Sequence, residues 1–178
     1  YTDFDEDMSS FLHNVTIEAK LKNTIISSDD LSIFAPALKT WHRNFNIDGN
    51  ALGKVDNFSV KKMTIQTGNT LVEGDINIHG LPDMQTTFID FTARNLETNY
   101  SELIAVVPSL KNVQNPRLSK LGNIKYKGNF TGFINDFVAF GTVSTNLGTI
   151  TTDLNMKLPV NRPAVYSGKI VTSNFNLG

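Results

Sequence analysis

Cysteine is absent from this 178-residue sequence. Its absence excludes disulfide bonds, thiolate zinc sites and cysteine nucleophiles. An excess of charge of either sign is missing too, since 16 Lys and Arg residues stand against 17 Asp and Glu residues and give a formal net charge of −1. That balance removes the general electrostatic reason for binding nucleic acid. We therefore expect no nucleic-acid partner.

Long hydrophobic runs are also missing. Apolar residues make up 40% of the chain, yet no stretch approaches the roughly 18 consecutive apolar residues of a transmembrane helix. No signal peptide is visible, and residue 1 is Tyr rather than Met. These features predict a fragment of a longer or processed protein.

Alternation of apolar and polar residues with a period of two is the main pattern that is present. In VTIEAKLKN (15–23), the apolar residues Val15, Ile17, Ala19 and Leu21 occupy every second position, as in a strand with one apolar face. Gly, Asn and Asp turns separate the segments that share this pattern, which favours an antiparallel sheet. The other segments are 58–68, 70–80, 86–95, 123–130, 136–146, 149–158 and 166–175.

The alternation breaks at Lys61 and Lys62 and resumes at Met63. An extra residue in one strand of a ladder restores the face of the side chains that follow it. The break therefore predicts a β-bulge at this point.

Two segments have helical rather than strand periodicity. The apolar residues Leu31, Phe34, Ala35 and Leu38, and likewise Leu103, Val106, Val107 and Leu110, are spaced i, i+3, i+4, i+7. Ser28 and Ser101, each followed by acidic residues, are suited to helix starts, and Pro36 and Pro108 should end each helix after about two turns. The fold class we expect is all-β, a mainly antiparallel sheet crossed by two short amphipathic helices.

The pattern occurs more than once along the chain. Leu31 and Leu103 are 72 residues apart, whereas Gly49 and Gly128, and Phe58 and Phe137, are 79 apart. We expect residues 1–178 to be one fragment of a repetitive domain, with units of approximately 15–86, 87–165 and a truncated 166–178. Each unit should consist of a strand, a short helix and about four strands, and Asn23, Asn95 and Asn174 are expected to end strands.

Motifs for catalysis or cofactor binding are not found. GNALGK (49–54) has glycine spacing one residue short of a phosphate-binding loop, and Val55 stands where Ser or Thr should be. His13, His42 and His79 lack the spacing of metal ligands. Two acidic clusters could be considered as calcium ligands, but Asp29-Asp30 is explained as charge at a helix start and Asp5-Glu6-Asp7 lies near the chain end. We expect no enzyme activity, no catalytic residues, no metal and no cofactor.

The long apolar face is the candidate functional feature, and two interpretations of it stay open. It can be the sealed core of a structural or adhesive module that binds protein or glycan, or an open groove that binds acyl chains. For an open groove, the residues expected to line it are Ile17, Leu21, Phe58, Val60, Ile76, Ile89, Phe91, Phe137, Val143, Leu154 and Ile170.

Most of the chain resembles the periplasmic repeats of TamB-like proteins of the AsmA-like superfamily. The stretches that carry the resemblance are DLSIFAPALKTW (30–41), residues 49–82, LGNIKYKGNFTGFINDFVAFGTVSTNLGTITTDLNM (121–156) and YSGKIVTSNFNLG (166–178). The resemblance implies an elongated twisted half-pipe of repeats, or β-taco groove. It also implies that this groove lies in the periplasm of a Gram-negative envelope and is tethered to the inner membrane. It also implies lipid transport and outer-membrane biogenesis as a translocation and assembly module. The expected partners are a phospholipid or other acyl-chain ligand and, through parts outside this fragment, an outer-membrane β-barrel of the TamA or BamA type.

Overall fold

The computed structural model describes residues 13–33, 36–106, 110–111, 117–159 and 162–174. The acidic cluster at 5–7 and the helix positions Phe34, Ala35, Val107 and Pro108 lie outside the described residues.

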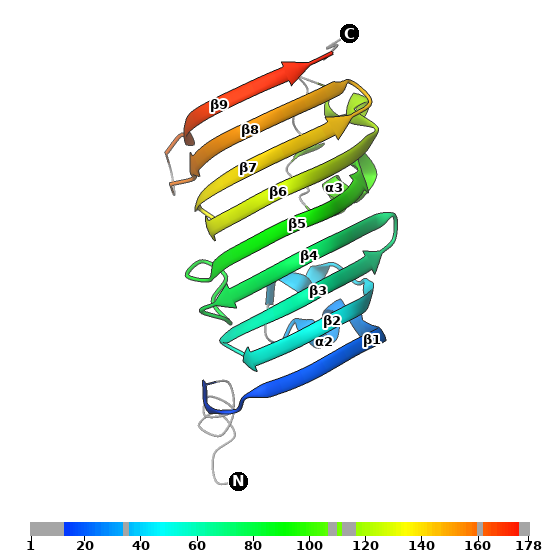
Figure 1. Ribbon diagram of the computed structural model, residues 1–178, viewed down its shortest axis with the longest axis vertical. Coiled ribbons are helices and arrows are strands. Elements are labelled where there is room, and N and C mark those ends of the chain that lie inside the picture. Colours follow the sequence, from blue (N-terminus) through cyan, green and yellow to red (C-terminus); the bar gives the residue numbers. More distant parts are fainter. Residues whose placement is uncertain (1–12, 34–35, 107–109, 112–116, 160–161, 175–178) are drawn as a thin grey trace.

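The described chain forms one nine-stranded sheet in which each strand pairs with the next, so that the strand order is the sequence order (Figure 1). Every neighbouring pair is antiparallel. The predicted all-β, antiparallel fold class is therefore confirmed. The strands are β1 (Ile17–Ser27), β2 (Asn44–Lys54), β3 (Asn57–Thr67), β4 (Thr70–His79), β5 (Phe88–Asn99), β6 (Asn123–Phe133), β7 (Asp136–Thr145), β8 (Gly148–Lys157) and β9 (Val165–Ser173).

Strand β2 is one that the alternation did not predict. Two glycines and several Asn and Asp residues interrupt its apolar pattern (NFNIDGNALGK), and such residues usually indicate turns. The 79-residue offset that relates Gly49 to Gly128 was the available signal, because Gly128 lies in the predicted strand that became β6.

The helical segments are shorter than expected. They are α2 (Ser28–Leu31), the 3₁₀ turn η1 (Pro36–Thr40), α3 (Tyr100–Val106) and the 3₁₀ turn η3 (Leu118–Leu121). The predicted caps were each displaced: the Ser27 hydroxyl, not that of Ser28, accepts a hydrogen bond from the Asp30 amide at 3.0 Å. At α3 the Asn99 side chain accepts from the Glu102 amide at 3.0 Å, in place of the expected Ser101.

The same element order occurs twice. A strand, helical turns and three strands make up β1 to β4, and the same series makes up β5 to β8. We expected about four strands after each helix. Three of them, such as β2 to β4, belong to the same series, and the fourth, such as β5, is the first strand of the next series. Asn23 and Asn95 do not end strands as predicted, because they lie inside β1 and β5 where the register shifts.

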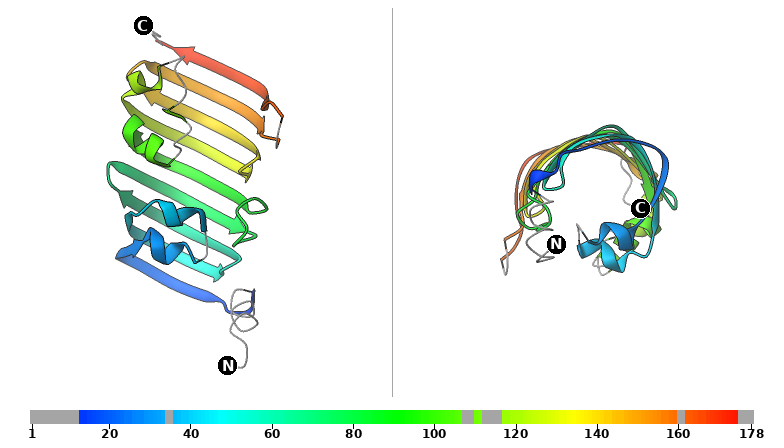
Figure 2. Two further views of the ribbon diagram at one scale, coloured as in Figure 1. Left: turned by 180° about the vertical axis from the view of Figure 1, so that it is seen from behind. Right: turned by 90° about the horizontal axis from the view of Figure 1, so that it is seen from below.

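Viewed along its long axis, the sheet is an arch, because each strand bends along its own length (Figure 2). Register shifts interrupt the pairing of β1 with β2, β2 with β3, β3 with β4, β4 with β5 and β5 with β6. An extra residue in one strand bends that strand and increases its twist. The predicted bulge at Lys61–Lys62 is confirmed by the shift between Val60 and Met63 and by a φ of 52° at Lys62.

The helical turns lie on the inner side of this arch, near one end of the strands (Figure 2). They cover little of it. Only Phe45, Val60, Met63 and Ala93 are buried apolar residues of the described chain. The molecule exposes 11504 Å², whereas a compact monomer of 19.7 kDa exposes about 8,600 Å². The inner face is therefore largely open rather than enclosed by a second layer.

Candidate functional site: the concave apolar face

Residues that lie directly opposite each other in neighbouring strands point to the same face of a sheet. The pairing can therefore be followed from β1 to β9 as rows of side chains. One such row, here called the first row, runs through Ile17, Gly53, Phe58, Ile78, Ile89, Gly132, Phe137, Met156 and Tyr166. The next row on that face runs through Ala19, Ala51, Val60, Ile76, Phe91, Phe130, Ala139, Leu154 and Gly168.

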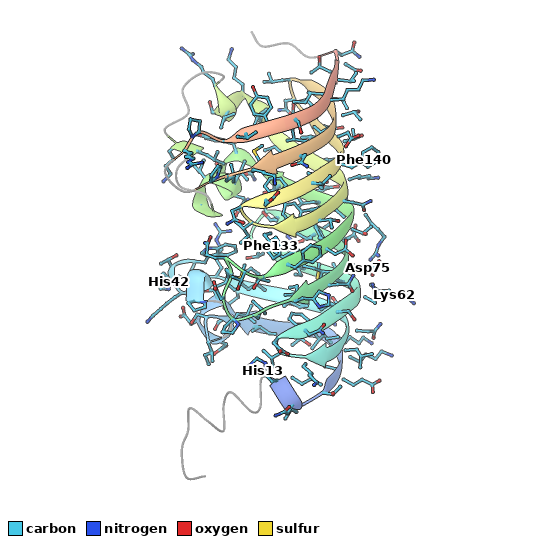
Figure 3. The ribbon with its side chains drawn as sticks, turned by 90° about the vertical axis from the view of Figure 1, so that its left-hand side faces the viewer. His13, His42, Lys62, Asp75, Phe133 and Phe140 are labelled. Carbon is cyan, nitrogen blue, oxygen red and sulfur yellow. The ribbon has the colours of Figure 1, made fainter. Side chains whose placement is uncertain are left out.

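The other face is the convex one. Figure 3 shows Lys62, Asp75 and Phe140 on the outer side of the arch. Asp75 lies between Gly74 and Ile76, so Val72, Ile76 and Ile78 of β4 alternate with it and point to the inner side. The rows that begin at Ile17 and Ala19 thus line the concave face.

The structure brings the eleven predicted lining residues together on this concave face. The first row holds Ile17, Phe58, Ile89 and Phe137. The second row holds Val60, Ile76, Phe91 and Leu154. The parallel rows beyond them hold Leu21, Ile170 and Val143. Val60 is buried, Ile17 and Ile170 are exposed, and the other eight are half-buried. Their role in binding lipid stays a prediction.

Further residues line the same face without having been predicted as lining. Ile47 belongs to the unpredicted strand β2, and it lies opposite Ile65 of β3. Phe130 and Met156 belong to predicted strands, and the alternation already pointed to them. The pairing adds one property of the whole face: none of the side chains in its rows carries a charge.

Two glycines of the concave face let the backbone of the opposite strand approach closely beside an aromatic residue. Gly53 lies opposite Phe58, and Gly132 lies opposite Phe137. The φ angles of these glycines are 136° and 137°, and a Cβ at either one would come within 2.4 Å of a backbone oxygen across the hairpin. The Phe137 ring packs at 4.8 Å, between centroids, from that of Phe130. The repeated Gly-Asn-x-x-Gly stretches are therefore strand positions beside an aromatic residue and not a phosphate-binding loop.

Tyr126 is the polar-tipped residue in the middle of this face. Its hydroxyl lies 3.1 Å from the carbonyl oxygen of Asn129 and 3.2 Å from that of Phe140, and it donates a hydrogen bond there. Burial raises the pKa of the Tyr126 hydroxyl, so this group stays neutral at physiological pH. A Cβ added at Gly128 would lie 2.7 Å from the Tyr126 hydroxyl oxygen, and one added at Gly141 would lie 2.7 Å from the Tyr126 ring.

The convex face carries the charged side chains of the strands, several of them in ion pairs, beside exposed apolar residues such as Leu52, Val138 and Phe140. Asp75 accepts a hydrogen bond from the Lys62 amide at 2.7 Å and from the Arg94 guanidinium at 2.6 Å. The Lys125 ammonium lies 2.9 Å from the Glu97 carboxylate, and its hydrogen bond lowers the pKa of Glu97. The two faces therefore differ in chemistry along the sheet.

The histidines do not form a site. Nδ1 of His13 lies 2.5 Å from Asp56, and Nδ1 of His42 lies 3.6 Å from Asp29, whereas the His79 ring is 6.5 Å from that of Phe88. Within the described ranges, no three His, Asp or Glu side chains are grouped so that they could hold a metal ion.

A recess of about 400 Å³ lies at one end of the strands, and its lining is mostly polar. Its lining residues are Asn69, Glu97, Thr98, Asn99, Asn123, Ile124 and Lys125. It is separate from the middle rows of the concave face and contains none of the predicted lining residues.

The fold and this face define a class of protein, namely a single-layer antiparallel half-pipe whose concave sheet face is uncharged and mostly apolar. No family model, no curated protein and no solved structure matches the chain. The resemblance to TamB-like repeats therefore stays a prediction. None of the helices in the described part of the chain is long and apolar enough to span a bilayer.

Proposed function

We propose that the concave face binds the acyl chains of lipids and that the chain is a segment of a groove along which lipids move. One observation carries the proposal: the face is uncharged, apolar and largely half-exposed across all nine strands. Singly scattered apolar residues on a surface need no explanation, whereas a large continuous apolar surface indicates a binding site.

The physical requirement for such a face comes from the cost of hydrating lipid chains. A two-chain phospholipid has about 30 methylene groups, and exposing each one to water costs ~0.8 kcal/mol, or about 24 kcal/mol in total. A protein that carries lipid through an aqueous space must therefore offer an unbroken apolar surface. A charged side chain on that surface would interrupt it, because desolvating an unpaired charge is costly.

The alternative is a structural or adhesive module with a sealed apolar core. A sealed core would bury most of its large apolar side chains. In the described chain Phe58, Phe91, Phe130 and Phe137 of this face are all half-buried instead. This openness favours the groove over the sealed module.

The wider setting is part of the same proposal. We place the chain in the periplasm of a Gram-negative envelope, as an internal segment of a TamB-like protein that is tethered to the inner membrane. It would conduct phospholipid toward the outer membrane, support the assembly of outer-membrane proteins with a β-barrel partner, or do both. The support is the resemblance in sequence together with the half-pipe shape, and no catalytic step is assigned to it.

The test is photo-crosslinking with matched positions on the two faces. A photoreactive residue replaces Phe91 or Phe137 on the concave face, and in separate variants Thr92 or Val138, the next residue of the same strand, on the convex face. After incubation with vesicles of phosphatidylethanolamine and phosphatidylglycerol, we expect covalent lipid at Phe91 and Phe137. Equal or greater labelling at Thr92 and Val138 contradicts the proposal.

A charge on the concave face gives an independent check. Phe137→Asp should lower the amount of co-purifying lipid severalfold, whereas Val138→Asp on the opposite face should leave it unchanged. Lipid is measured by extraction and mass spectrometry of the purified chain. If neither the original chain nor Val138→Asp contains lipid after vesicle incubation, the sealed module is favoured.

A further inference from the structure

The concave face meets two different rims, one at each end of the strands. The helical turns lie at only one of them, here called the helix-bearing rim (Figure 2). Its strand ends are Ser27, Asn44, Thr67, Thr70, Asn99, Asn123, Thr145, Gly148 and Ser173. The strand ends of the opposite rim are Ile17, Lys54, Asn57, His79, Phe88, Phe133, Asp136, Lys157 and Val165. The first row of the concave face runs beside the opposite rim, and none of its residues is Ser, Thr, Asn or Gln.

Threonine hydroxyls line the concave face beside the helix-bearing rim. A third row through Gly128 and Gly141 and a fourth through Tyr126 and Val143 follow the first two. Alternation along the strands then places a fifth row at this rim. It consists of Ile26, Phe45, Thr67, Thr70, Thr98, Ile124, Thr145 and Gly148. The hydroxyl oxygens of Thr70 and Thr98 lie 2.8 Å apart, so these two side chains share a face, and the first two rows contain no threonine.

The polar recess described above lies at the same rim. Its lining includes Thr98 and Ile124 of the fifth row, together with three asparagines and the ion pair of Lys125 with Glu97. The 3₁₀ turn η3 ends two residues before Asn123, which also belongs to that lining. The recess therefore offers amide and ammonium donors where the apolar rows end.

The helix-bearing rim also has an excess of positive charge. The segments that join strands there (28–43, 68–69, 100–122 and 146–147) contain five Lys and Arg residues against three Asp and Glu residues. The joining segments of the opposite rim (55–56, 80–87, 134–135 and 158–164) contain one Arg against two Asp residues. The difference favours an anionic group, such as a phosphate, at the helix-bearing rim.

Arg117 and Lys120 are the cations that best fit this role. Both are exposed, and neither takes part in an ion pair with another described residue. The Lys120 amide donates to the Arg117 carbonyl oxygen at 3.0 Å, and side chains three residues apart in a 3₁₀ turn lie on the same side. The Asn146 amide, in the turn between β7 and β8, donates to the Leu121 carbonyl oxygen at 3.0 Å and holds η3 against the rim.

We propose that the helix-bearing rim binds the phosphate-bearing headgroup of a lipid whose acyl chains run along the strands toward the opposite rim. This inference rests on the proposed lipid-binding function and adds the class of headgroup and the direction in which the lipid lies. From Tyr126 in the fourth row to Gly132 in the first, a strand covers about 20 Å. An acyl chain in a bilayer extends about 15 Å, half of the hydrocarbon core. The chains therefore fit across the groove between the two rims.

The single tryptophan of the sequence reports on the helix-bearing rim. The centroid of the Trp41 ring lies 6.2 Å from that of Phe45 in the fifth row. The chain is incubated with phosphatidylglycerol vesicles that contain a phosphatidylcholine with a nitroxide either on its headgroup or near the end of one acyl chain, and it is then separated from the vesicles. Nitroxides quench tryptophan fluorescence only at short range. We expect the headgroup label to quench Trp41 severalfold more than the chain label.

A second reporter tests the opposite rim. The double variant Trp41→Phe/Phe137→Trp moves the tryptophan to the first row, and circular dichroism checks its folding. The chain label should now quench more than the headgroup label. Equal quenching by the two labels at both positions, or the reverse order, overturns the proposed direction while lipid binding stands. If neither label quenches at either position, no lipid is bound, and the proposed function fails together with this inference.

Charge reversal tests the headgroup separately from the chains. Arg117→Glu/Lys120→Glu is compared with Lys54→Glu/Arg162→Glu, which reverses two exposed cations at the opposite rim. Each variant is incubated with vesicles that contain phosphatidylglycerol and diacylglycerol, and the lipid bound to the purified chain is measured by mass spectrometry. We expect the first variant to lose phosphatidylglycerol severalfold and to keep diacylglycerol, which has the same chains but no phosphate. Equal losses of phosphatidylglycerol in the two variants, or equal losses of both lipids in the first, contradict the proposal.

Discussion

Arg43 and Glu102 form an ion pair although they are 59 positions apart in the chain. Arg43 immediately precedes β2, and its backbone forms two hydrogen bonds with Ser28 of α2. The Ser28 amide donates to the Arg43 carbonyl oxygen at 2.7 Å, and the Arg43 amide donates to the Ser28 hydroxyl oxygen at 3.0 Å. Glu102 lies in α3, and its carboxylate also accepts from the Asn69 amide in the β3–β4 turn at 3.1 Å. The pair therefore ties the helical segment of the first series of strands to that of the second.

Replacement of Glu102 by Gln should destabilise the fold. The side chains of Arg43 and Glu102 are only 25% and 12% exposed, so the loss of the carboxylate leaves a partly buried guanidinium with a weaker partner. We expect Glu102→Gln to reduce the free energy of unfolding in urea by about 1–3 kcal/mol. Asp136→Asn, which weakens the exposed pair with Lys157, is the control, with a change below about 1 kcal/mol. Equal effects of the two substitutions would contradict a special role for the Arg43–Glu102 pair.

The same pair predicts how stability depends on pH. The hydrogen bond from Arg43, followed by that from the Asn69 amide, lowers the pKa of Glu102 from its ordinary value of 4.5. Because the pKa is lower in the folded state than in the unfolded state, the stabilisation is complete above pH 4.5 and is lost as the pH falls through the folded pKa. The difference in unfolding free energy between the original chain and Glu102→Gln should therefore shrink below pH 4.5. A difference that is constant from pH 7 to pH 3 would exclude this linkage.

Asp75 should stabilise the bulge in β3. It accepts the Lys62 amide and the Arg94 guanidinium, and Lys62 has the left-handed φ of 52°. We expect Asp75→Ala to cost about 1–2 kcal/mol in chemical denaturation. Asp153→Ala is a matched control on β8, because it lies at the corresponding position and β7 pairs with β8 without a bulge; its cost should be within about 0.5 kcal/mol. Costs of the same size at both positions would sink the explanation.

Gly132 should not tolerate a side chain. A Cβ there would come within 2.4 Å of the Asp136 carbonyl oxygen and 2.7 Å of the Phe137 Cα, at a φ of 137°. Gly132→Ala is expected to cost roughly 1–3 kcal/mol from backbone strain, measured as the free energy of unfolding. Asn129→Ala, an exposed position of the same strand, should change stability by at most about 0.5 kcal/mol. A neutral Gly132→Ala variant would show that the strand relaxes without cost.

Much of the sheet was predictable because side chains alternate along a strand with a period of two. That rule assigned the inward residues Phe91 and Phe137 to one face, and the broken alternation at Lys61–Lys62 indicated the bulge. The rule failed at β2, where Gly49 and Gly53 stand at inner-face positions because backbone and side-chain atoms of β3 lie too close for a Cβ there. It also misplaced the helix starts, because Ser27 and Asn99 compete with their neighbours for the same role.

The sequence by itself determined which face is apolar in every strand except β2, that the strands are antiparallel and that the pattern occurs more than once, since these are local properties of alternation and turn chemistry. The tertiary structure decided the arch, the openness of the concave face and the contact between Arg43 and Glu102. Curvature depends on which residues pair across strands, and openness depends on whether another layer covers the sheet. Both are relations between distant parts of the chain, which local periodicity does not contain.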